Sequence, residues 1–148
     1  MRGKYRMEAT AMVTLITGEK GTGKTKKLIQ VANEAMERSM GNVVFIEKGT
    51  ALTYDISHKI RLVDIEEYNV VGFEAFYGFI AGLCAGNYDL TDVIIDSTLK
   101  IGGRDLNALA DFVENLNGLS ERTSTNIVMT VSADESEFPP KIKMILNK

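Results

Sequence analysis

The chain has 148 residues, of which 45% are hydrophobic and 25% are charged, and this composition excludes a globally disordered protein. Its 17 basic and 20 acidic residues give a formal net charge of −3 at pH 7, which argues against a general nucleic-acid-coating role. A single cysteine, Cys84, excludes a disulfide framework and a cysteine-rich zinc site. No run of 18 apolar residues is present, so we expect no membrane insertion and a cytoplasmic location.

The first eleven residues differ from the rest of the chain. They carry Arg2, Lys4 and Arg6 and show no clear hydrophobic period. We therefore predict that residues 1–11 form a flexible N-terminal arm, and that residues 12–148 form a single domain.

From residue 12 onward, short apolar runs typical of buried strands alternate with segments of helical periodicity. The predicted strands lie at residues 12–17, 43–46, 60–63, 93–96 and 127–131, and the shorter run at 60–63 is expected at an edge. Helical spacing of apolar residues appears around residues 28–36, 71–85 and 106–116, and a last apolar turn covers residues 142–146. This alternation predicts an α/β protein, a three-layer α/β/α sandwich with a mostly parallel sheet of about five strands.

One motif carries specific chemistry. The segment GEKGTGKT follows the first predicted strand, opens the first predicted helix and matches G-x-x-x-x-G-K-[ST] without a mismatch. Its residues are Gly18, Glu19, Lys20, Gly21, Thr22, Gly23, Lys24 and Thr25.

Glycines leave room for a phosphate against the backbone N–H groups, and the positive end of the helix dipole adds to the attraction. Lys24 can reach the β- and γ-phosphates, and the Thr25 hydroxyl can coordinate Mg²⁺. The motif therefore predicts a site for ATP with Mg²⁺. Lys20 is the weaker ligand in this loop, because the deviant form of the loop places its second lysine where Glu19 stands.

Two acidic residues follow predicted strands and are candidates for the same site. Asp96 ends the run 93–95 at the carboxyl edge of the sheet, where it could hold the magnesium together with Thr25. Glu47 ends the run 43–46 and is the candidate to orient a water molecule for hydrolysis. The alternative interpretation of both carboxylates is that they cap a loop. Ser97 stands after Asp96 where many hydrolases have a glutamate.

Other polar residues have weaker claims to the site. Ser132 follows the last strand, where a polar side chain could sense the γ-phosphate. Arg104 and Arg122 flank the helix at 106–116 and could neutralise phosphate, but arginines in such positions usually face water.

Three segments together resemble the nucleotide-binding core of the RecA-like branch of P-loop NTPases: GEKGTGKT, VVFIEKGTAL and VIIDST. The resemblance extends from about residue 12 to residue 131 and implies that Lys24 and Thr25 act in the phosphate loop and Asp96 is the Walker B aspartate. It also implies a catalytic glutamate just beyond the second strand, which Glu47 precedes by about two residues. The chain is similar as well to small bacterial P-loop proteins often labelled PilT-like, although the histidine-rich boxes of PilT motors are not visible.

Three functions remain open at this point. The first is a slow or partner-activated ATPase, and the second is a nucleotide-binding switch or interaction module that does not hydrolyse its ligand. The third is a small-molecule kinase, for which the segment after residue 96 offers only Arg104 as a lid arginine. The expected partners are ATP and either further copies of the chain or another protein.

Overall fold

A computed structural model of the chain describes residues 5–9 and 12–146. Within this part the protein has one six-stranded sheet and five α-helices, which confirms the α/β class. The strands are β1 (Arg6–Ala9), β2 (Val13–Gly18), β3 (Asn42–Glu47), β4 (Arg61–Asp64), β5 (Leu90–Ile95) and β6 (Asn126–Ser132). The spatial order is β1-β2-β6-β5-β3-β4, and every neighbouring pair is parallel except β1 with β2.

The strand β1 was not expected. The sequence predicted a flexible arm over residues 1–11, whereas Arg6–Ala9 pair antiparallel with β2, with Arg6 opposite Thr17. Arg6 also forms an ion pair with Glu135 at 2.7 Å. A four-residue edge strand held by backbone hydrogen bonds needs no hydrophobic alternation, which explains why the pattern did not reveal it. Residues 1–4 and 10–11 of the predicted arm lie outside the described residues.

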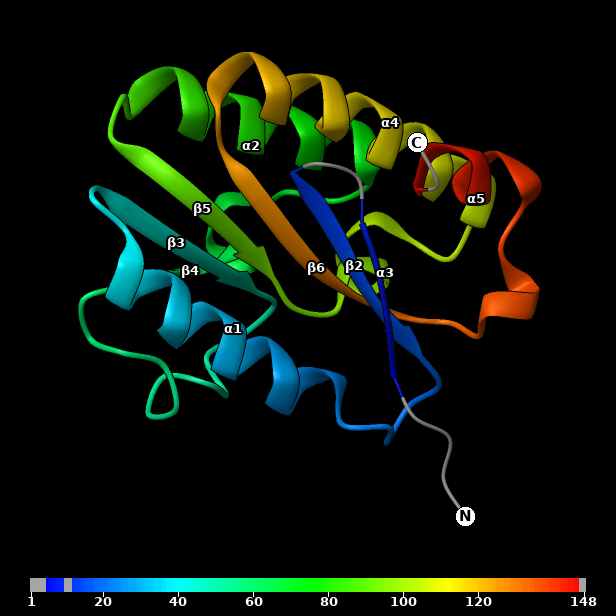
Figure 1. Ribbon diagram of the computed structural model, residues 1–148, viewed down its shortest axis with the longest axis horizontal. Coiled ribbons are helices and arrows are strands. Elements are labelled where there is room, and N and C mark those ends of the chain that lie inside the picture. The colour runs from blue at the N-terminus through cyan, green and yellow to red at the C-terminus, as the bar shows by residue number, and fades with distance from the viewer. Residues whose placement is uncertain (1–4, 10–11, 147–148) are drawn as a thin grey trace.

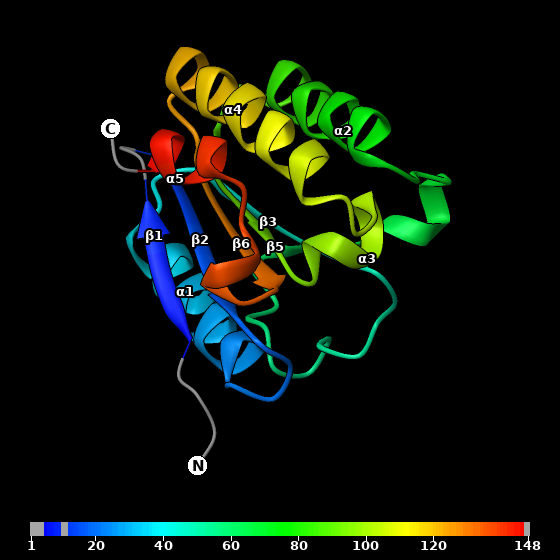
Figure 2. The same cartoon turned by 90° about the vertical axis from the view of Figure 1, so that its right-hand side faces the viewer.

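Helices cover both faces of the sheet. The helices are α1 (Lys24–Arg38), α2 (Phe73–Gly86), α3 (Thr98–Gly102), α4 (Leu106–Thr123) and α5 (Pro140–Leu146), with short 3₁₀ helices η1 (Ile65–Tyr68) and η2 (Glu135–Glu137). In both views of the ribbon, α1 lies on one face, and α2 and α4 lie side by side on the other (Figures 1 and 2). The helix α3 is an addition that the sequence pattern did not predict.

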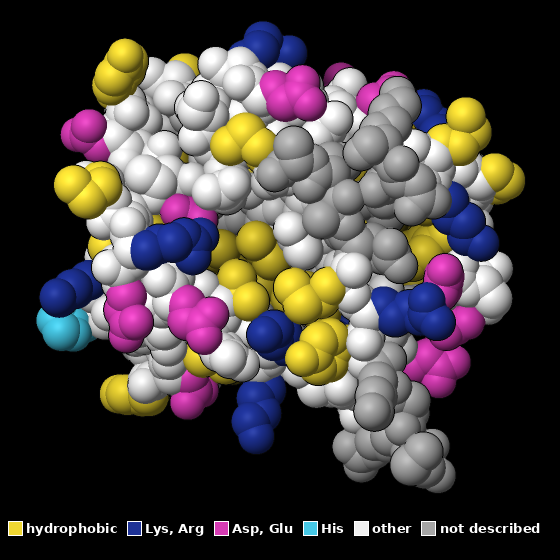
Figure 3. Space-filling view, viewed as in Figure 1, with side chains coloured by type: hydrophobic (Ala, Val, Ile, Leu, Met, Phe, Trp, Pro, Cys, Tyr) yellow, Lys and Arg dark blue, Asp and Glu magenta, His cyan; other side chains and the backbone are white. Residues whose placement is uncertain are grey.

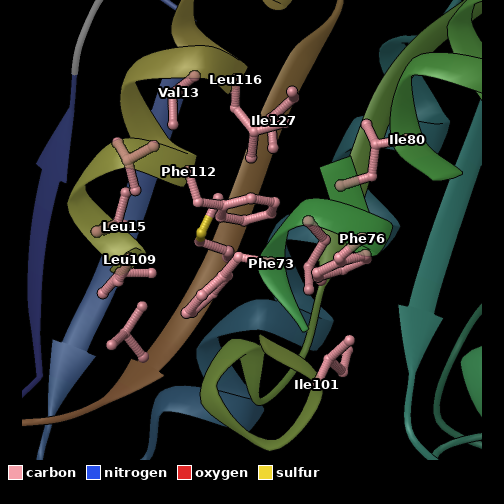
Figure 4. Packing of buried hydrophobic residues seen from close by; sticks show 14 of the residues in the cluster. Val13, Leu15, Phe73, Phe76, Ile80, Ile101, Leu109, Phe112, Leu116 and Ile127 are labelled. Carbon is pink, nitrogen blue, oxygen red and sulfur yellow. The ribbon is translucent and has the colours of Figure 1, made fainter. Parts of the chain in front are cut away.

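The core has one part on each side of the sheet, because alternate residues of a strand point to opposite faces. On the α1 side, Phe45 and Ile94 pack with Leu28. On the other side, Phe112 of α4 packs against both Phe73 and Phe76 of α2, with ring centroids 5.0 and 5.3 Å apart (Figure 4). Phe73 and Phe76 of α2 are therefore part of the core.

The parallel arrangement brings five strand ends to one edge of the sheet. The loop after β2 lies there, together with the residues that end or follow the other strands, Glu47, Asp96 and Ser132. Basic and acidic side chains are interspersed over the molecular face of Figure 3. No helix in the described part of the chain is both long and apolar enough to cross a membrane.

Candidate functional site

The loop between β2 and α1 owes its shape to glycines. Gly21 and Gly23 have φ angles of 85° and 89°, a region that other residues rarely adopt. Gly23 is the N-cap of α1, and its carbonyl oxygen accepts a hydrogen bond from the Lys27 amide at 3.1 Å. At Gly18 a Cβ atom would approach the Thr22 hydroxyl to 2.7 Å, so a side chain there would push against the loop. The loop therefore leads directly from a buried strand into the N-terminus of a 15-residue helix.

Lys24 is buried at the start of α1, with 6% of its surface exposed. Its Nζ atom donates a hydrogen bond to the Glu19 carbonyl oxygen at 2.8 Å, and the Thr22 hydroxyl donates to the same oxygen at 2.8 Å. Burial lowers the pKa of the lysine, and the negative charge of Asp96 partly opposes this effect. The ammonium group is thus held across the phosphate loop by a single neutral oxygen, which a ligand with negative charge would replace favourably.

Asp96 lies at the centre of a small hydrogen-bond network on the carboxyl side of β5. Its Oδ1 atom accepts hydrogen bonds from the Thr25 hydroxyl at 3.1 Å and from the Thr130 hydroxyl at 2.9 Å. The Ser97 hydroxyl donates to Oδ2 at 3.3 Å, and the Ser97 amide donates to the Thr130 hydroxyl at 2.7 Å. Residues 71 positions apart in the sequence, Thr25 and Asp96, are therefore in direct contact.

This donor set suits Mg²⁺ when phosphate is also present. Carboxylate and hydroxyl oxygens are hard ligands, and Mg²⁺ is usually held by one or two protein groups together with phosphates and water. No group of three or more histidine, cysteine or acidic side chains in the described residues could hold a metal by itself. Thr25 and Asp96 fit a magnesium ion that arrives with a nucleotide.

Glu47 is buried at the end of β3, where its register partner is Asp64, the last residue of β4. Its Oε2 atom accepts a hydrogen bond from the Leu52 amide at 3.3 Å. Burial raises the pKa of this carboxyl group; the negative charges of Asp96 and Asp64 raise it further, while backbone amides of Leu52 and Ala51 act in the opposite direction. Glu47 is thus close to Asp96 and directed to its own following loop.

A hollow of about 590 Å³ opens beside the phosphate loop. Its walls come from the loop itself, from α3 and the segment after it, and from the end of β6 with the turn that leads to η2. Five of its lining side chains are basic, namely Lys20, Lys24, Lys26, Lys100 and Arg104. Three are acidic, namely Glu19, Asp134 and Glu137. The excess of cations suits a polyphosphate ligand.

Most residues that the sequence singled out for this site are neighbours here. Of the phosphate loop, all but Gly18 and Thr22 line the hollow, and Ser132, the register neighbour of Gly18, lines it as well. Neither Asp96 nor Glu47 lines the hollow. Asp96 accepts a hydrogen bond from Thr25, which does line it.

Two residues at the site, Thr130 and Lys100, were not considered. Arg104 is exposed, as expected, and it also lines the hollow. A buried hydroxyl in the otherwise apolar run 127–131 was the available signal for Thr130. For the two basic residues the sequence offered only their place shortly after Asp96.

Comparisons with known proteins leave the chain without an assigned family. No family model matches it, and no curated protein matches it. A solved structure of the pCW3 conjugation coupling protein TcpA, in its monomer form with ATPγS, is similar to the chain with 14% sequence identity and a TM-score of 0.48. The similarity covers 96% of this chain and 52% of that one, so the chain spans about half the length of that protein.

Proposed function

We propose that the chain is a P-loop nucleotide-binding protein of the RecA-like branch, with a three-layer α/β/α arrangement, which binds ATP together with Mg²⁺. The observation that carries this proposal is the contact between the Thr25 hydroxyl and the Asp96 carboxylate at 3.1 Å beside the buried Lys24. A glycine-rich turn with an incidental lysine has no reason to bring a carboxylate from a distant strand to the threonine that follows.

Each residue has a separate task in this proposal. The N–H groups of residues 21–25 surround the phosphates at the positive end of α1. Lys24 leaves the Glu19 carbonyl oxygen and pairs with phosphate oxygens, where its charge is better compensated. Thr25 and Asp96 hold Mg²⁺, which offsets the charge of the phosphates when it is bound.

For the activity of the chain toward bound ATP, we propose slow or partner-activated hydrolysis. Hydrolysis requires a group that orients water. Glu47 is near Asp96, but its carboxylate accepts the Leu52 amide and does not line the hollow. Rapid turnover therefore needs a rearrangement of the loop after β3, which a second copy of the chain or another protein would drive.

The position of Glu47 equally favours a second candidate function, a nucleotide-dependent switch without appreciable turnover. Ser97, in the place where many hydrolases have a glutamate, donates its hydroxyl to Asp96 and supplies no base. In this case nucleotide binding would be communicated to a partner through the surface of the chain. Measured turnover distinguishes the two functions, and both require the same binding site.

Nucleotide binding is tested by thermal unfolding and calorimetric titration. At about one hundred times its dissociation constant, Mg-ATP should stabilise the chain by about 2.7 kcal/mol, which corresponds to about 5–10 °C in Tm. Lys24→Ala should abolish most of this shift without lowering the Tm of the free chain, because the removed ammonium is buried against one carbonyl oxygen. Lys27→Ala is the matched control, since this lysine lies on the same helix outside the hollow.

Equal stabilisation of wild type and Lys24→Ala by ATP would refute the phosphate-loop assignment. The same titrations also test the assignment of Asp96 to the metal. Asp96→Asn should weaken binding in Mg²⁺ far more than binding in EDTA, whereas equal losses would make Asp96 a structural residue.

A further inference from the structure

The sequence offered no convincing source within the chain for a cation on the terminal phosphate, and the structure points to one. We propose that Arg104 contacts the terminal phosphate of ATP bound to its own chain, so that the site distinguishes ATP from ADP. This inference rests on the proposed nucleotide-binding function and adds to it a residue that selects the triphosphate.

The first support is that Arg104 lines the same hollow as the phosphate loop. Its Nη2 atom donates a hydrogen bond to the Ser132 carbonyl oxygen at 3.4 Å. Ser132 is the register neighbour of Gly18, the first residue of the phosphate loop. The guanidinium group therefore extends from the segment after α3 over the end of β6, toward the loop that would hold the phosphates.

The second support is the way in which this segment is anchored to the metal-binding residues. It begins directly after Asp96, and the Ser97 amide is held by the Thr130 hydroxyl at 2.7 Å. The helix α3 ends at Gly102, and its C-cap Gly103 has a φ of 106°, a conformation that glycine adopts easily. Arg104 follows this residue, so its backbone is joined to Asp96 through one short, hydrogen-bonded connection.

The third support is the unused binding capacity of the side chain. A guanidinium group has five N–H donors in a planar fork that matches phosphate oxygens. In the described part of the chain, Arg104 has the Ser132 carbonyl oxygen as its hydrogen-bond partner and forms no ion pair with a carboxylate.

The acidic groups nearby are already engaged. Asp134 accepts hydrogen bonds from the amide and the hydroxyl of Ser136, and Glu137 accepts one from the Asp134 amide. In the described residues, none of the acidic side chains that line this hollow, Glu19, Asp134 and Glu137, forms an ion pair with Arg104.

The terminal phosphate is the part of the ligand that this position suits. Lys24, Thr25 and Asp96 gather at the end of the loop where the β- and γ-phosphates and their metal would lie. Arg104 belongs to the segment that follows Asp96, and it lines the same hollow as Lys24 and Thr25. Removal of the guanidinium group should therefore weaken the binding of the triphosphate more than the binding of the diphosphate.

The test is a calorimetric titration of the full chain with Mg-ATP and with Mg-ADP. The wild type should bind ATP more tightly than ADP. In Arg104→Ala the affinity for ATP should fall by about 10- to 100-fold, the range for a lost hydrogen bond to a charged group, while that for ADP changes little. The ATP affinity of Arg104→Lys should lie between those of the wild type and Arg104→Ala, because lysine keeps the positive charge and lacks the planar set of N–H donors.

Arg122→Ala is the matched control, since this arginine lies at the other end of α4 and lines a different hollow. Arg104 is exposed, and unchanged thermal unfolding of the nucleotide-free variant shows that its fold is intact. A ratio of ATP to ADP affinity that is the same in wild type and Arg104→Ala overturns this inference and leaves the proposed function standing. Failure of the wild type to bind either nucleotide overturns both.

Discussion

Glu47 is the residue whose environment departs most from its expected role. A carboxylate at the end of a strand would ordinarily be exposed, but Glu47 is 6% exposed and stands beside Asp96 and Asp64. Burial and these two neighbours raise its pKa above the usual value. The charged form is therefore disfavoured in the folded chain relative to the unfolded chain.

We predict that Glu47→Gln alters the pH dependence of stability. Because the pKa of the folded state is raised, the contribution of Glu47 to the free energy of unfolding is fully present below the unfolded-state pKa of about 4.5 and is lost as pH rises through the folded-state pKa. The glutamine keeps an acceptor for the Leu52 amide and carries no charge. The variant should therefore be more stable than wild type at pH 7, by about 1.4 kcal/mol for each unit by which the pKa is raised.

Thermal unfolding of both proteins between pH 4 and pH 8 measures this difference. The gap in Tm should widen as pH rises from 4.5, and Glu67→Gln, on the exposed surface of η1, should show no such trend. A difference in Tm that does not change with pH would show that burial does not raise the pKa of the Glu47 carboxyl group.

At the scale of elements, α3 connects the core to the site. It follows Asp96, precedes Arg104, and packs on α2 through Gly102 and the ring of Phe73. A Cβ atom at Gly102 would overlap this ring, which is itself fixed against Phe112 with centroids 5.0 Å apart. The position of the candidate phosphate-contacting arginine thus depends on close contact between a glycine and an aromatic core residue.

We predict that Gly102→Ala destabilises the chain by about 1–3 kcal/mol, the cost of overpacking a well-packed core. Because the strain would move α3, ATP affinity should also fall, more than ADP affinity. Gly78→Ala is the control, since Gly78 lies within α2 with open space around its Cα. That change should stabilise the helix by about 0.5–1 kcal/mol. Chemical denaturation measures both, and a neutral Gly102→Ala would mean that α3 is loosely packed.

At the scale of the whole molecule, we predict that the isolated chain hydrolyses ATP at less than about 1 s⁻¹. In the proposed site, Lys24, Thr25, Asp96 and Arg104 would stabilise charge, but Glu47, the candidate to orient water, accepts the Leu52 amide of the loop after β3. Several hollow-lining residues, including Lys20, Lys26 and Arg104, are exposed, so water is not excluded from the site. Turnover should rise with chain concentration or with a partner that covers this edge. A rate at or above about 1 s⁻¹, unchanged by dilution and by Glu47→Gln, would contradict this expectation.

The sequence by itself determined the parts of this protein that depend on neighbouring residues. Apolar runs and helical spacing predicted five of the strands and the helices α1, α2 and α4, because burial on one or both sides imposes a local period. Where α5 lies, the sequence predicted only an apolar turn. The phosphate loop was visible for the same reason, since its eight residues are contiguous and its glycines serve a local backbone turn.

The tertiary structure decided what depends on the order of the strands. Parallel pairing of β5 with β6 and of β6 with β2 brings Asp96 to Thr25 and sets Ser132 beside Gly18, and no local period encodes that order. It also turned Glu47 toward Leu52, paired β1 with β2, and placed Arg104 within hydrogen-bond distance of Ser132. These contacts join residues that are far apart in the chain or lack a repeating pattern, so only the packing of the folded sheet and helices could select them.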